Sequence, residues 1–251
     1  MSTIAVITAR GGSKRIPRKN IREFCGKPII TYSIKAALSA GIFDEVMVST
    51  DDAEIAEIAK KAGAKVPFFR SADTANDFAN TTDVMLEVLN AYKEQGREFD
   101  VACCIYPTAP FVTADKLKKA YAAMQEKKAE ALLPVVKFSF PPQRSVVQNG
   151  DFLSFKWPEH MFTRSQDLEP FYHDAGQFYF IRVADFYRQK KLIMDKTVPF
   201  PLPELEVQDI DTMDDWEIAE VKYRVMEKRE TAEKQWEPYG KEIMKNRMEK
   251  K

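Results

Sequence analysis

The chain has 251 residues, 45% hydrophobic and 30% charged, which is typical of a soluble globular protein that is long enough for one α/β domain with an insertion. Its 38 lysines and arginines balance its 38 aspartates and glutamates, which disfavours nucleic acid as a partner because nucleic-acid binders usually carry a basic excess. No apolar run approaches the roughly 20 residues of a membrane span, and no signal peptide is evident, so we expect a cytoplasmic protein with no membrane contact.

Cysteine and histidine are too few for several kinds of site. Cys25, Cys103 and Cys104 lack C-x-x-C spacing, which suits a reducing compartment and argues against structural zinc. His160 and His173 are the only histidines, so a histidine-rich metal centre and a Ser-His-Asp hydrolase are both poorly supported.

A basic, glycine-containing loop follows the first predicted strand. The apolar run at residues 4–7 predicts that strand, and the basic loop covers residues 8–20. Gly11 and Gly12 would let backbone N–H groups converge on one point, and nearby cations would add charge for a polyanion such as a triphosphate. The loop fits neither the Walker A pattern nor the dinucleotide-binding pattern G-x-G-x-x-G. Its basic residues are Arg10, Lys14, Arg15, Arg18 and Lys19.

Strand-like and helix-like segments then alternate along the chain. The apolar run at residues 101–106 is typical of a central parallel strand that is buried on both faces. We expect one helix to open at Pro28, a favoured first-turn residue, and to end at Gly41. Other strands are predicted at residues 45–49, 65–69, 131–136, 177–181, 197–200 and 205–210, and other helices at residues 52–62, around 85–92, around 117–124 and from about 212.

This alternation predicts an α/β fold with a mostly parallel sheet and helices on both faces. Ligands bind such sheets at the carboxyl ends of the strands. A short basic cluster can be an ordinary solvated turn, but this one leaves the first strand at that edge, which favours a phosphate site. We expect the basic loop, residues 49–52, residues 107–110 and residues 209–211 to meet on one rim.

Two segments depart from the alternating pattern. Residues 139–172 mix prolines, aromatic residues and polar residues without periodicity, which predicts an arm or small subdomain inserted in a domain of residues 1–221. Residues 222–251 form a highly charged helical pattern, which is usually a solvated surface.

Two aspartates near the end of the domain are candidate metal ligands. Asp209 and Asp211 flank Ile210, and alternation along a strand would point both carboxylates to the same face. Paired hard oxygen ligands across from a phosphate loop suit Mg²⁺. The alternative is a polar strand end with Asp211 as a helix cap, but the nearby basic loop favours the metal. Arg70 ends a predicted strand and could pair equally with a phosphate or with a helix acid.

Several of these segments together resemble a known family. Residues 9–20, ARGGSKRIPRKN, are similar to the signature of the CMP-acylneuraminate cytidylyltransferases. Segments at residues 43–51, 55–59, 107–110 (PTAP) and 209–212 (DIDT) continue the resemblance, which spans about residues 4–220. It implies a three-layer, Rossmann-like nucleotide-diphospho-sugar transferase fold of the GT-A type. It also implies a homodimer in which the inserted segment reaches the partner and could bring Lys137 or Arg164 to the sugar carboxylate.

Two segments resemble the pseudaminic acid branch of this family, namely residues 104–111 and 172–179. Tyr106 stands where sialic acid enzymes tend to carry Gln, and Ala175 stands where they tend to carry Asn. Aromatic residues of the insertion could line an apolar sugar pocket or form a dimer interface, and we weigh these two readings equally.

The resemblance implies a role for each matching residue. Arg10, Lys19, Asp209 and Asp211 would be catalytic, with Mg²⁺ on the two aspartates. The nucleotide CTP would be bound by Ala9, Arg10, Gly11, Ser13, Lys14, Lys19, Asn20, Arg70 and Thr81. The sugar would be bordered by Tyr106, Gln177 and Tyr179.

The expected reaction is attack by the anomeric hydroxyl of pseudaminic acid on the α-phosphorus of CTP, giving CMP-pseudaminic acid for surface or flagellin glycosylation. Asp209 and a metal-bound water are both candidates for the base. CMP-legionaminate, CMP-sialate and CMP-KDO synthesis are alternatives. A catalytically silent nucleotide-sugar-binding protein and an RNA-binding protein are alternatives from other classes.

Overall fold

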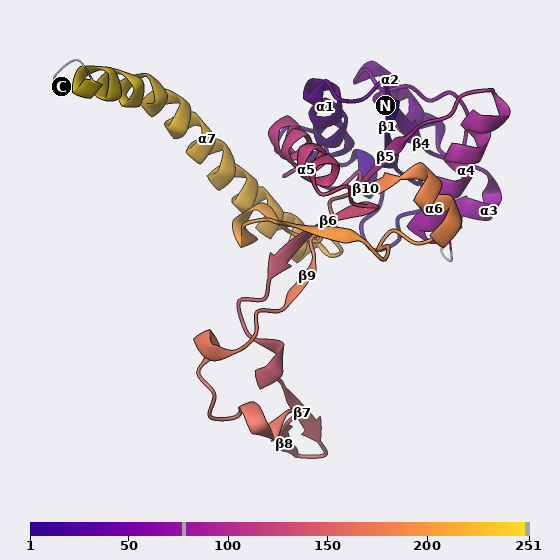
Figure 1. Ribbon diagram of the computed structural model, residues 1–251. Helices are drawn as coiled ribbons and strands as arrows, with labels where there is room; N and C mark the ends of the chain where they lie inside the picture. Colours follow the sequence, from indigo (N-terminus) through magenta and orange to yellow (C-terminus); the bar gives the residue numbers. More distant parts are fainter. Residues whose placement is uncertain (77–78, 249–251) are drawn as a thin grey trace.

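The computed structural model describes residues 1–76 and 79–248, and it is built around a mixed sheet with helices on both faces (Figure 1). The strand order is β11-β6-β10-β5-β1-β4, and β9 pairs with β6 off this path. Strands β4 and β5 lie parallel to β1, and β11 lies parallel to β6, whereas β10 runs antiparallel between β5 and β6. The strands are β1 (Thr3–Thr8), β4 (Glu45–Ser49), β5 (Val101–Ile105), β6 (Ala131–Lys137), β9 (Tyr172–Asp174), β10 (Phe178–Arg182) and β11 (Thr197–Pro201).

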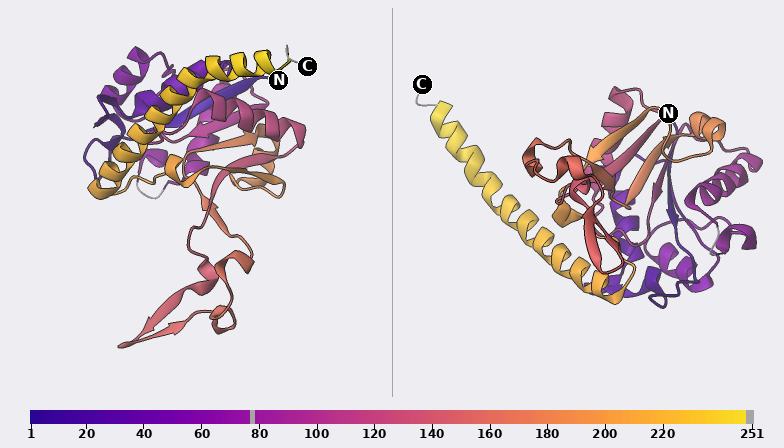
Figure 2. Two further views of the ribbon diagram at one scale, coloured as in Figure 1. Left: turned by 90° about the vertical axis from the view of Figure 1, so that its left-hand side faces the viewer. Right: turned by 90° about the horizontal axis from the view of Figure 1, so that it is seen from below.

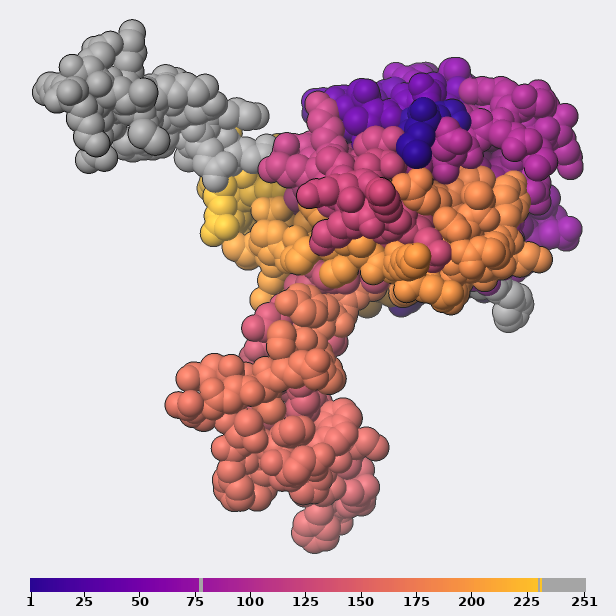
Figure 3. Space-filling view, viewed as in Figure 1, coloured from indigo at the N-terminus to yellow at the C-terminus, as the bar shows by residue number. Residues whose placement is uncertain are grey.

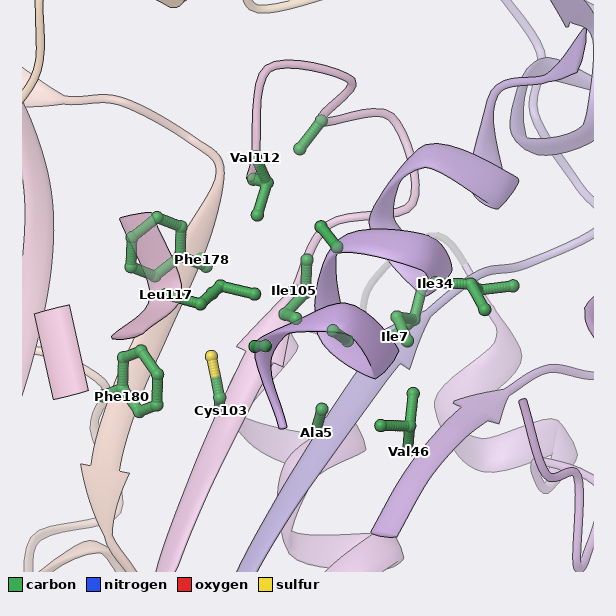
Figure 4. Close-up of a cluster of buried hydrophobic side chains, with 14 of the residues drawn as sticks. Ala5, Ile7, Ile34, Val46, Cys103, Ile105, Val112, Leu117, Phe178 and Phe180 are labelled. Carbon is green, nitrogen blue, oxygen red and sulfur yellow. The ribbon is translucent and has the colours of Figure 1, made fainter. Parts of the chain in front are cut away.

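The helices divide between the two faces according to the alternation of side chains along the strands. Ile34 of α1 and Leu117 of α5 pack with Ile7 of β1 on one face, as Figure 4 shows. Met85 of α4 and Phe186 of α6 pack on the other face. The helices are α1 (Ile30–Ala40), α2 (Ala53–Lys61), α3 (Ala72–Ala75), α4 (Thr81–Glu94), α5 (Ala114–Glu126), α6 (Val183–Gln189) and α7 (Met213–Met248). The α/β fold and the mostly parallel sheet are confirmed.

Side-chain caps fix where the helices near the ligand edge begin. Asp52 accepts a hydrogen bond from the backbone of Ile55 at the start of α2, and Asn80 forms a reciprocal capping box with Asp83 at the start of α4. At the C-terminal end of α1, Gly41 adopts a left-handed conformation with φ of 62° and ends the helix. Pro28 does not open α1, because it belongs to the short strand β3 (Lys27–Pro28), which pairs with β2 (Glu23–Phe24).

Two predicted strands are absent from the described residues. Of residues 65–69, Lys65 alone bridges to β4, because Pro67 has no N–H with which to continue the ladder. Residues 205–210 do not form a strand either; a 3-10 turn, η5 (Glu204–Glu206), precedes an irregular stretch. The same-face argument for Asp209 and Asp211 was therefore wrong in its premise, and their proximity has to be judged from the structure itself.

An arm, residues 138–171, leaves the sheet after β6 and returns through β9 (Figures 1 and 2). The N–H group of Phe138 donates to the carbonyl oxygen of Phe171 at 3.0 Å and closes its root. The arm carries a hairpin of β7 (Val146–Asn149) and β8 (Phe152–Phe155), together with the turns η2 (Pro142–Arg144), η3 (Pro158–His160) and η4 (Ser165–Asp167). Figure 3 shows that it stands clear of the body of the molecule.

Helix α7 begins against the domain and then runs away from it (Figure 1). Trp216 and Ala219 are buried with Phe24 and Phe111, and this contact anchors the first turns of the helix beside the basic loop. The domain boundary suggested at residue 222 lies inside this continuous helix. Within residues 1–76 and 79–248, no helix combines the length and apolarity needed to cross a membrane.

Candidate functional site

A cavity of about 640 Å³ lies at the carboxyl ends of β1 and β5, beside the basic loop. The lining includes many of the residues that the sequence singled out, which the fold gathers from four separate stretches of the chain. These are Arg10, Ser13, Lys14, Lys19, Asn20, Arg70, Thr81 and Tyr106. The rest of the lining consists of Thr8, Arg15, Thr74, Asn76, Ala79, Asn80, Val84, Pro107 and Thr108.

Two hydrogen bonds hold the basic loop in shape. The Nδ2 atom of Asn20 donates to the carbonyl oxygen of Arg10 at 2.8 Å. The N–H group of Gly11 donates to the Oδ1 atom of Asp51 at 3.0 Å, which ties the loop to the end of β4. Neither Gly11 nor Gly12 has a positive φ. A Cβ atom on Gly11 would lie 2.6 Å from the Oδ2 atom of Asp52, so this glycine is needed for close approach.

The cations of the basic loop divide into two groups. Arg10, Lys14, Arg15 and Lys19 line the cavity, and the guanidinium of Arg10 donates to the carbonyl oxygen of Asn76 at 3.2 Å. Arg18 instead forms ion pairs with Asp52 and Glu54 at the start of α2. The Arg18 ion pair lowers the pKa of Asp52 to about 2. Arg18 therefore fastens the loop, while the other four cations remain on the cavity side.

Asp209 and Asp211 lie near Lys19, outside the lining of the cavity. The Nζ atom of Lys19 lies 2.6 Å from the carbonyl oxygen of Ile210 and 3.4 Å from the Oδ1 atom of Asp211, and Arg15 lies 2.8 Å from the same Oδ1 atom. Burial and the adjacent Asp211 raise the pKa of Asp209, so the two carboxylates are close enough to repel each other.

We call Asp209 and Asp211 the acidic pair. Asp211 does not cap α7, which was the alternative to a metal site. Thr212 caps α7, because its Oγ1 atom accepts from the N–H group of Asp215 while the Asp215 carboxylate accepts from the N–H group of Thr212. Among the described residues, no group of three or more acidic, histidine or cysteine side chains could hold a metal on its own. Two carboxylates fit a hard cation such as Mg²⁺ whose other oxygen ligands come from phosphates and water.

Arg70 is a buried cation on the cavity wall, with 8% of its surface exposed. Its Nε atom donates to the Oγ atom of Ser49 at 3.0 Å, and its NH2 group donates to the carbonyl oxygen of Ser49 at 2.7 Å. Burial lowers the pKa of Arg70, and the charges of Asp51 and Glu87 oppose this effect. The side chain is thus fixed in direction before any ligand arrives, which is the form of preorganisation that favours anion binding.

Thr81 and Tyr106 form an uncharged wall of the cavity. The hydroxyl groups of Thr81 and Tyr106 lie 3.2 Å apart, and the ring of Tyr106 lies 5.4 Å from that of Tyr179. Tyr179 lies behind Tyr106 and outside the lining, and its hydroxyl donates to the Oδ2 atom of Asp174 at 2.7 Å. Gln177 is also buried, and its Nε2 atom donates to the carbonyl oxygen of Glu206 at 2.6 Å.

Some residues named from the sequence are not brought to the cavity surface. Ala9 is fully buried under the loop, where its N–H group bonds to Ser49, and Gly11 faces Asp52. Arg164 lies in the arm and pairs with Asp167. The sequence placed residues 107–110 on this rim, and Pro107 and Thr108 do line the cavity, but it did not single out Thr74, Asn76 or Asn80. The pattern Asn80-x-x-Asp83 is a helix-start signal that could have placed Asn80 at the ligand edge.

Comparisons with known proteins identify a family and relatives for this chain. A family model described as cytidylyltransferase matches residues 4–213. The chain is 42% identical over 226 residues to a pseudaminic acid cytidylyltransferase of Campylobacter jejuni, covering 90% of this chain and 97% of that one. It is 33% identical over 229 residues to a CMP-N,N'-diacetyllegionaminic acid synthase of Legionella pneumophila, covering 88% of this chain and 95% of that one.

A solved structure shares the fold. The structure of a CMP:2-keto-3-deoxy-manno-octonic acid synthetase complexed with CTP superposes with a TM-score of 0.65 at 21% identity, and the match covers 91% of this chain and all of that one. At this identity the likeness shows the fold alone, and it confirms the fold class expected from the sequence.

Proposed function

Because the chain belongs to the cytidylyltransferase family, and is therefore a nucleotidyltransferase, we propose that it transfers CMP from CTP to a nonulosonic acid and releases pyrophosphate. We propose pseudaminic acid as the acid. The relative that carries this name is 42% identical over nearly its whole length, against 33% for the legionaminic acid relative. The product would serve glycosylation of surface structures such as flagellin.

One observation carries the proposal, namely the placement of four cations of the basic loop and of two carboxylates beside one cavity. Arg10, Lys14 and Lys19 can bind a triphosphate, and the acidic pair lies beside Lys19. When bound, Mg²⁺ would be held by Asp209 and Asp211 and would offset the charge of the phosphates. The uncharged wall with Tyr106 leaves space for groups that are not phosphates.

The chemistry needs positioning and charge stabilisation and no covalent enzyme intermediate. The anomeric oxygen of the acid forms a bond to the α-phosphorus of CTP, and the bond from that phosphorus to the oxygen of the β-phosphate breaks. The hydroxyl proton is released, and pyrophosphate carries away the negative charge. Arg10 and Lys19 would stabilise this charge as it develops on the leaving group.

We also propose that the protein is a homodimer joined through the arm. Phe140, Phe152 and Phe162 are 86%, 79% and 88% exposed on it, which is unusual for large apolar side chains that remain in water. Aromatic residues of this kind are enriched in protein interfaces. We propose a second copy of the chain as the partner, because no other protein takes part in the proposed reaction.

The test of the proposed function is release of pyrophosphate from CTP by the purified chain against pseudaminic, legionaminic, sialic and KDO acids. We expect release to require CTP, Mg²⁺ and a nonulosonic acid together, and to be fastest with pseudaminic acid. An Arg10→Ala variant that keeps its fold should lose most of this turnover. Binding of CTP without turnover of any acid would favour the silent binding protein and would sink the enzyme proposal.

A further inference from the structure

A chain of two hydrogen bonds and one ring contact joins the exposed Asp174, at the root of the arm, to the cavity. It runs from Asp174 through Tyr179 and Tyr106 to Thr81, and we call these four residues the hydroxyl relay. We propose that Asp174 is a positioning residue for the acid substrate, acting through Tyr179 on Tyr106. This inference rests on the proposed function and adds to it a residue that touches neither CTP nor the cations.

Asp174 is held in place by the backbone on both sides. It is the last residue of β9 and pairs with Val135 of β6, beside the arm root (Figure 1). Its Oδ1 atom accepts from the N–H group of Gly176 at 2.8 Å, across a turn in which Gly176 has a φ of 61°. Its Oδ2 atom accepts from the Tyr179 hydroxyl at 2.7 Å. One carboxylate therefore fixes both the turn into β10 and the phenol that follows it.

The direction of the hydrogen bond to Asp174 limits what Tyr106 can do. A phenol has one hydrogen, and a carboxylate can accept only. Since Tyr179 gives its one hydrogen to Asp174, it has none left to donate to the neighbouring Tyr106 phenol. Tyr179 is 4% exposed, so its side chain has little contact with water. Tyr106 is thereby held by its ring contact with Tyr179 and by the Thr81 hydroxyl at its tip.

The position of Tyr106 places the relay on the side where the acid must bind. The N–H group of Tyr106 donates to the carbonyl oxygen of Gln177 at 2.8 Å, and the Gln177 side chain donates to the carbonyl oxygen of Glu206 at 2.6 Å. In the sequence, Glu206 is followed by two residues and then by the acidic pair. The triphosphate is expected along the basic loop and Thr81 beside the nucleotide. The Tyr106 end of the uncharged wall is therefore left for the sugar of the acid, whose hydroxyl and amide groups suit a hydroxyl partner.

A purely structural role for Asp174 makes a different prediction, and two substitutions separate the two roles. Asp174→Asn keeps an oxygen that can accept from Gly176 and so keeps the turn, but its amide group is a donor and cannot accept from Tyr179. Tyr179→Phe keeps the ring and the turn but removes the hydroxyl. If Asp174 acts through Tyr179, both changes remove the same contact.

The experiment measures kcat and KM for pseudaminic acid and for CTP in both single variants, in the double variant and in Asp115→Asn, an exposed control on α5. We expect KM for the acid to rise at least fivefold in each single variant and no further in the double variant, with KM for CTP within twofold of the unmodified chain. Thermal unfolding is followed in parallel, and Tyr179→Phe serves if Asp174→Asn does not fold.

Additive effects in the double variant, or an unchanged KM for the acid in both single variants, would overturn the inference while leaving the proposed function standing. Equal losses for both substrates that follow a lowered melting temperature would show a structural role and would also overturn it. An unmodified chain that turns over no acid would overturn the proposed function, and the inference with it.

Discussion

The Nζ atom of Lys19 lies 2.6 Å from the carbonyl oxygen of Ile210, and this hydrogen bond joins segments that are 191 residues apart in the sequence. Ile210 separates Asp209 from Asp211, so the same contact holds the basic loop against the acidic pair. A triphosphate bound along the loop would meet a fixed ammonium group beside the two carboxylates. Lys19 is thus the residue at which the two charged halves of the candidate site meet.

The first prediction concerns Lys19. Replacing it by Gln removes a preorganised positive charge from the leaving pyrophosphate while leaving a side chain that can still donate to Ile210. We expect kcat to fall by about 10²–10³, as for loss of one preorganised donor at a developing charge. Lys27→Gln is the matched control, since Lys27 is exposed on β3. Similar kinetics in the two variants would remove Lys19 from the site.

The paired glycines of the basic loop allow a matched test of its packing. An added Cβ atom would meet the Oδ2 atom of Asp52 at 2.6 Å on Gly11, but nothing within 4 Å on Gly12. Because Asp52 is held by Arg18 and by the N–H group of Ile55, it cannot simply move aside. We expect Gly11→Ala to lower the free energy of unfolding by about 1–3 kcal/mol, measured by urea denaturation, and Gly12→Ala to change it little. Equal effects at both positions would contradict this account of Gly11.

The ion pair between Arg18 and Asp52 should make stability depend on pH. The pKa of Asp52 is lowered from 3.8 to about 2, so its contribution is complete above about pH 4 and is lost as the pH falls through about 2. Asp52→Asn keeps the helix cap and removes the charge. Since Arg18 is 40% exposed and screened by solvent, we expect a loss of about 1 kcal/mol at pH 7 that shrinks towards pH 2.

The control for this effect is Glu57→Gln, which breaks an exposed pair with Lys60 at 3.2 Å. It should leave the free energy of unfolding nearly unchanged at both ends of the pH range. A loss in Asp52→Asn that is the same at pH 7 and near pH 2 would show that the ion pair does not contribute as described.

The acidic pair should govern the response to Mg²⁺. We expect a chelator to abolish turnover, and Asp211→Asn to raise the Mg²⁺ concentration for half-maximal turnover at least tenfold, because one of two carboxylate ligands is lost. Binding of Mn²⁺ in the presence of CTP, followed by electron paramagnetic resonance, gives a readout that does not depend on activity. Asp214→Asn, on the exposed side of the first turn of α7, is the control. Identical titrations for Asp211→Asn and the unmodified chain would refute the ligand role.

The arm should decide the oligomeric state. Sedimentation equilibrium of the unmodified chain is expected to give twice the chain mass of 28.8 kDa. Replacing both Phe152 and Phe162 by Ser should shift the protein towards monomer. Because both side chains are exposed on the arm, the double substitution should not unfold the monomer itself, which thermal unfolding checks. A monomeric unmodified chain would end the dimer proposal.

Much of the sheet could be read from the sequence because its strands are short apolar runs between helix signals. Residues 101–105 form β5 as expected, since both faces of that strand are covered and every residue in it is apolar. Two strand predictions were wrong, because neither segment pairs with a neighbouring strand along its length. Residues 65–69 contain Pro67, and residues 205–210 follow Pro201 and Pro203 without meeting a strand.

The candidate site was only partly readable for a similar reason. Charge and glycine content in the basic loop pointed to a phosphate site, and Arg10 and Lys19 do line the cavity. Composition could not show that Arg18 turns away to Asp52, because that depends on a long-range contact. Nor could it reveal the role of Asp174, because its contact with Val135 depends on the pairing of β9 with β6 and its contact with Tyr179 depends on the turn into β10.

The central claim is that the phosphorus atom next to the ribose of CTP becomes bonded to the acid. Phosphorus-31 NMR of the purified chain with CTP, Mg²⁺ and pseudaminic acid tests it most directly, because it reports the fate of all three phosphorus atoms in one sample. The account predicts one phosphodiester signal of a CMP conjugate and pyrophosphate in equimolar amount. CMP monoester with pyrophosphate, CDP with inorganic phosphate, or unchanged CTP would each contradict it.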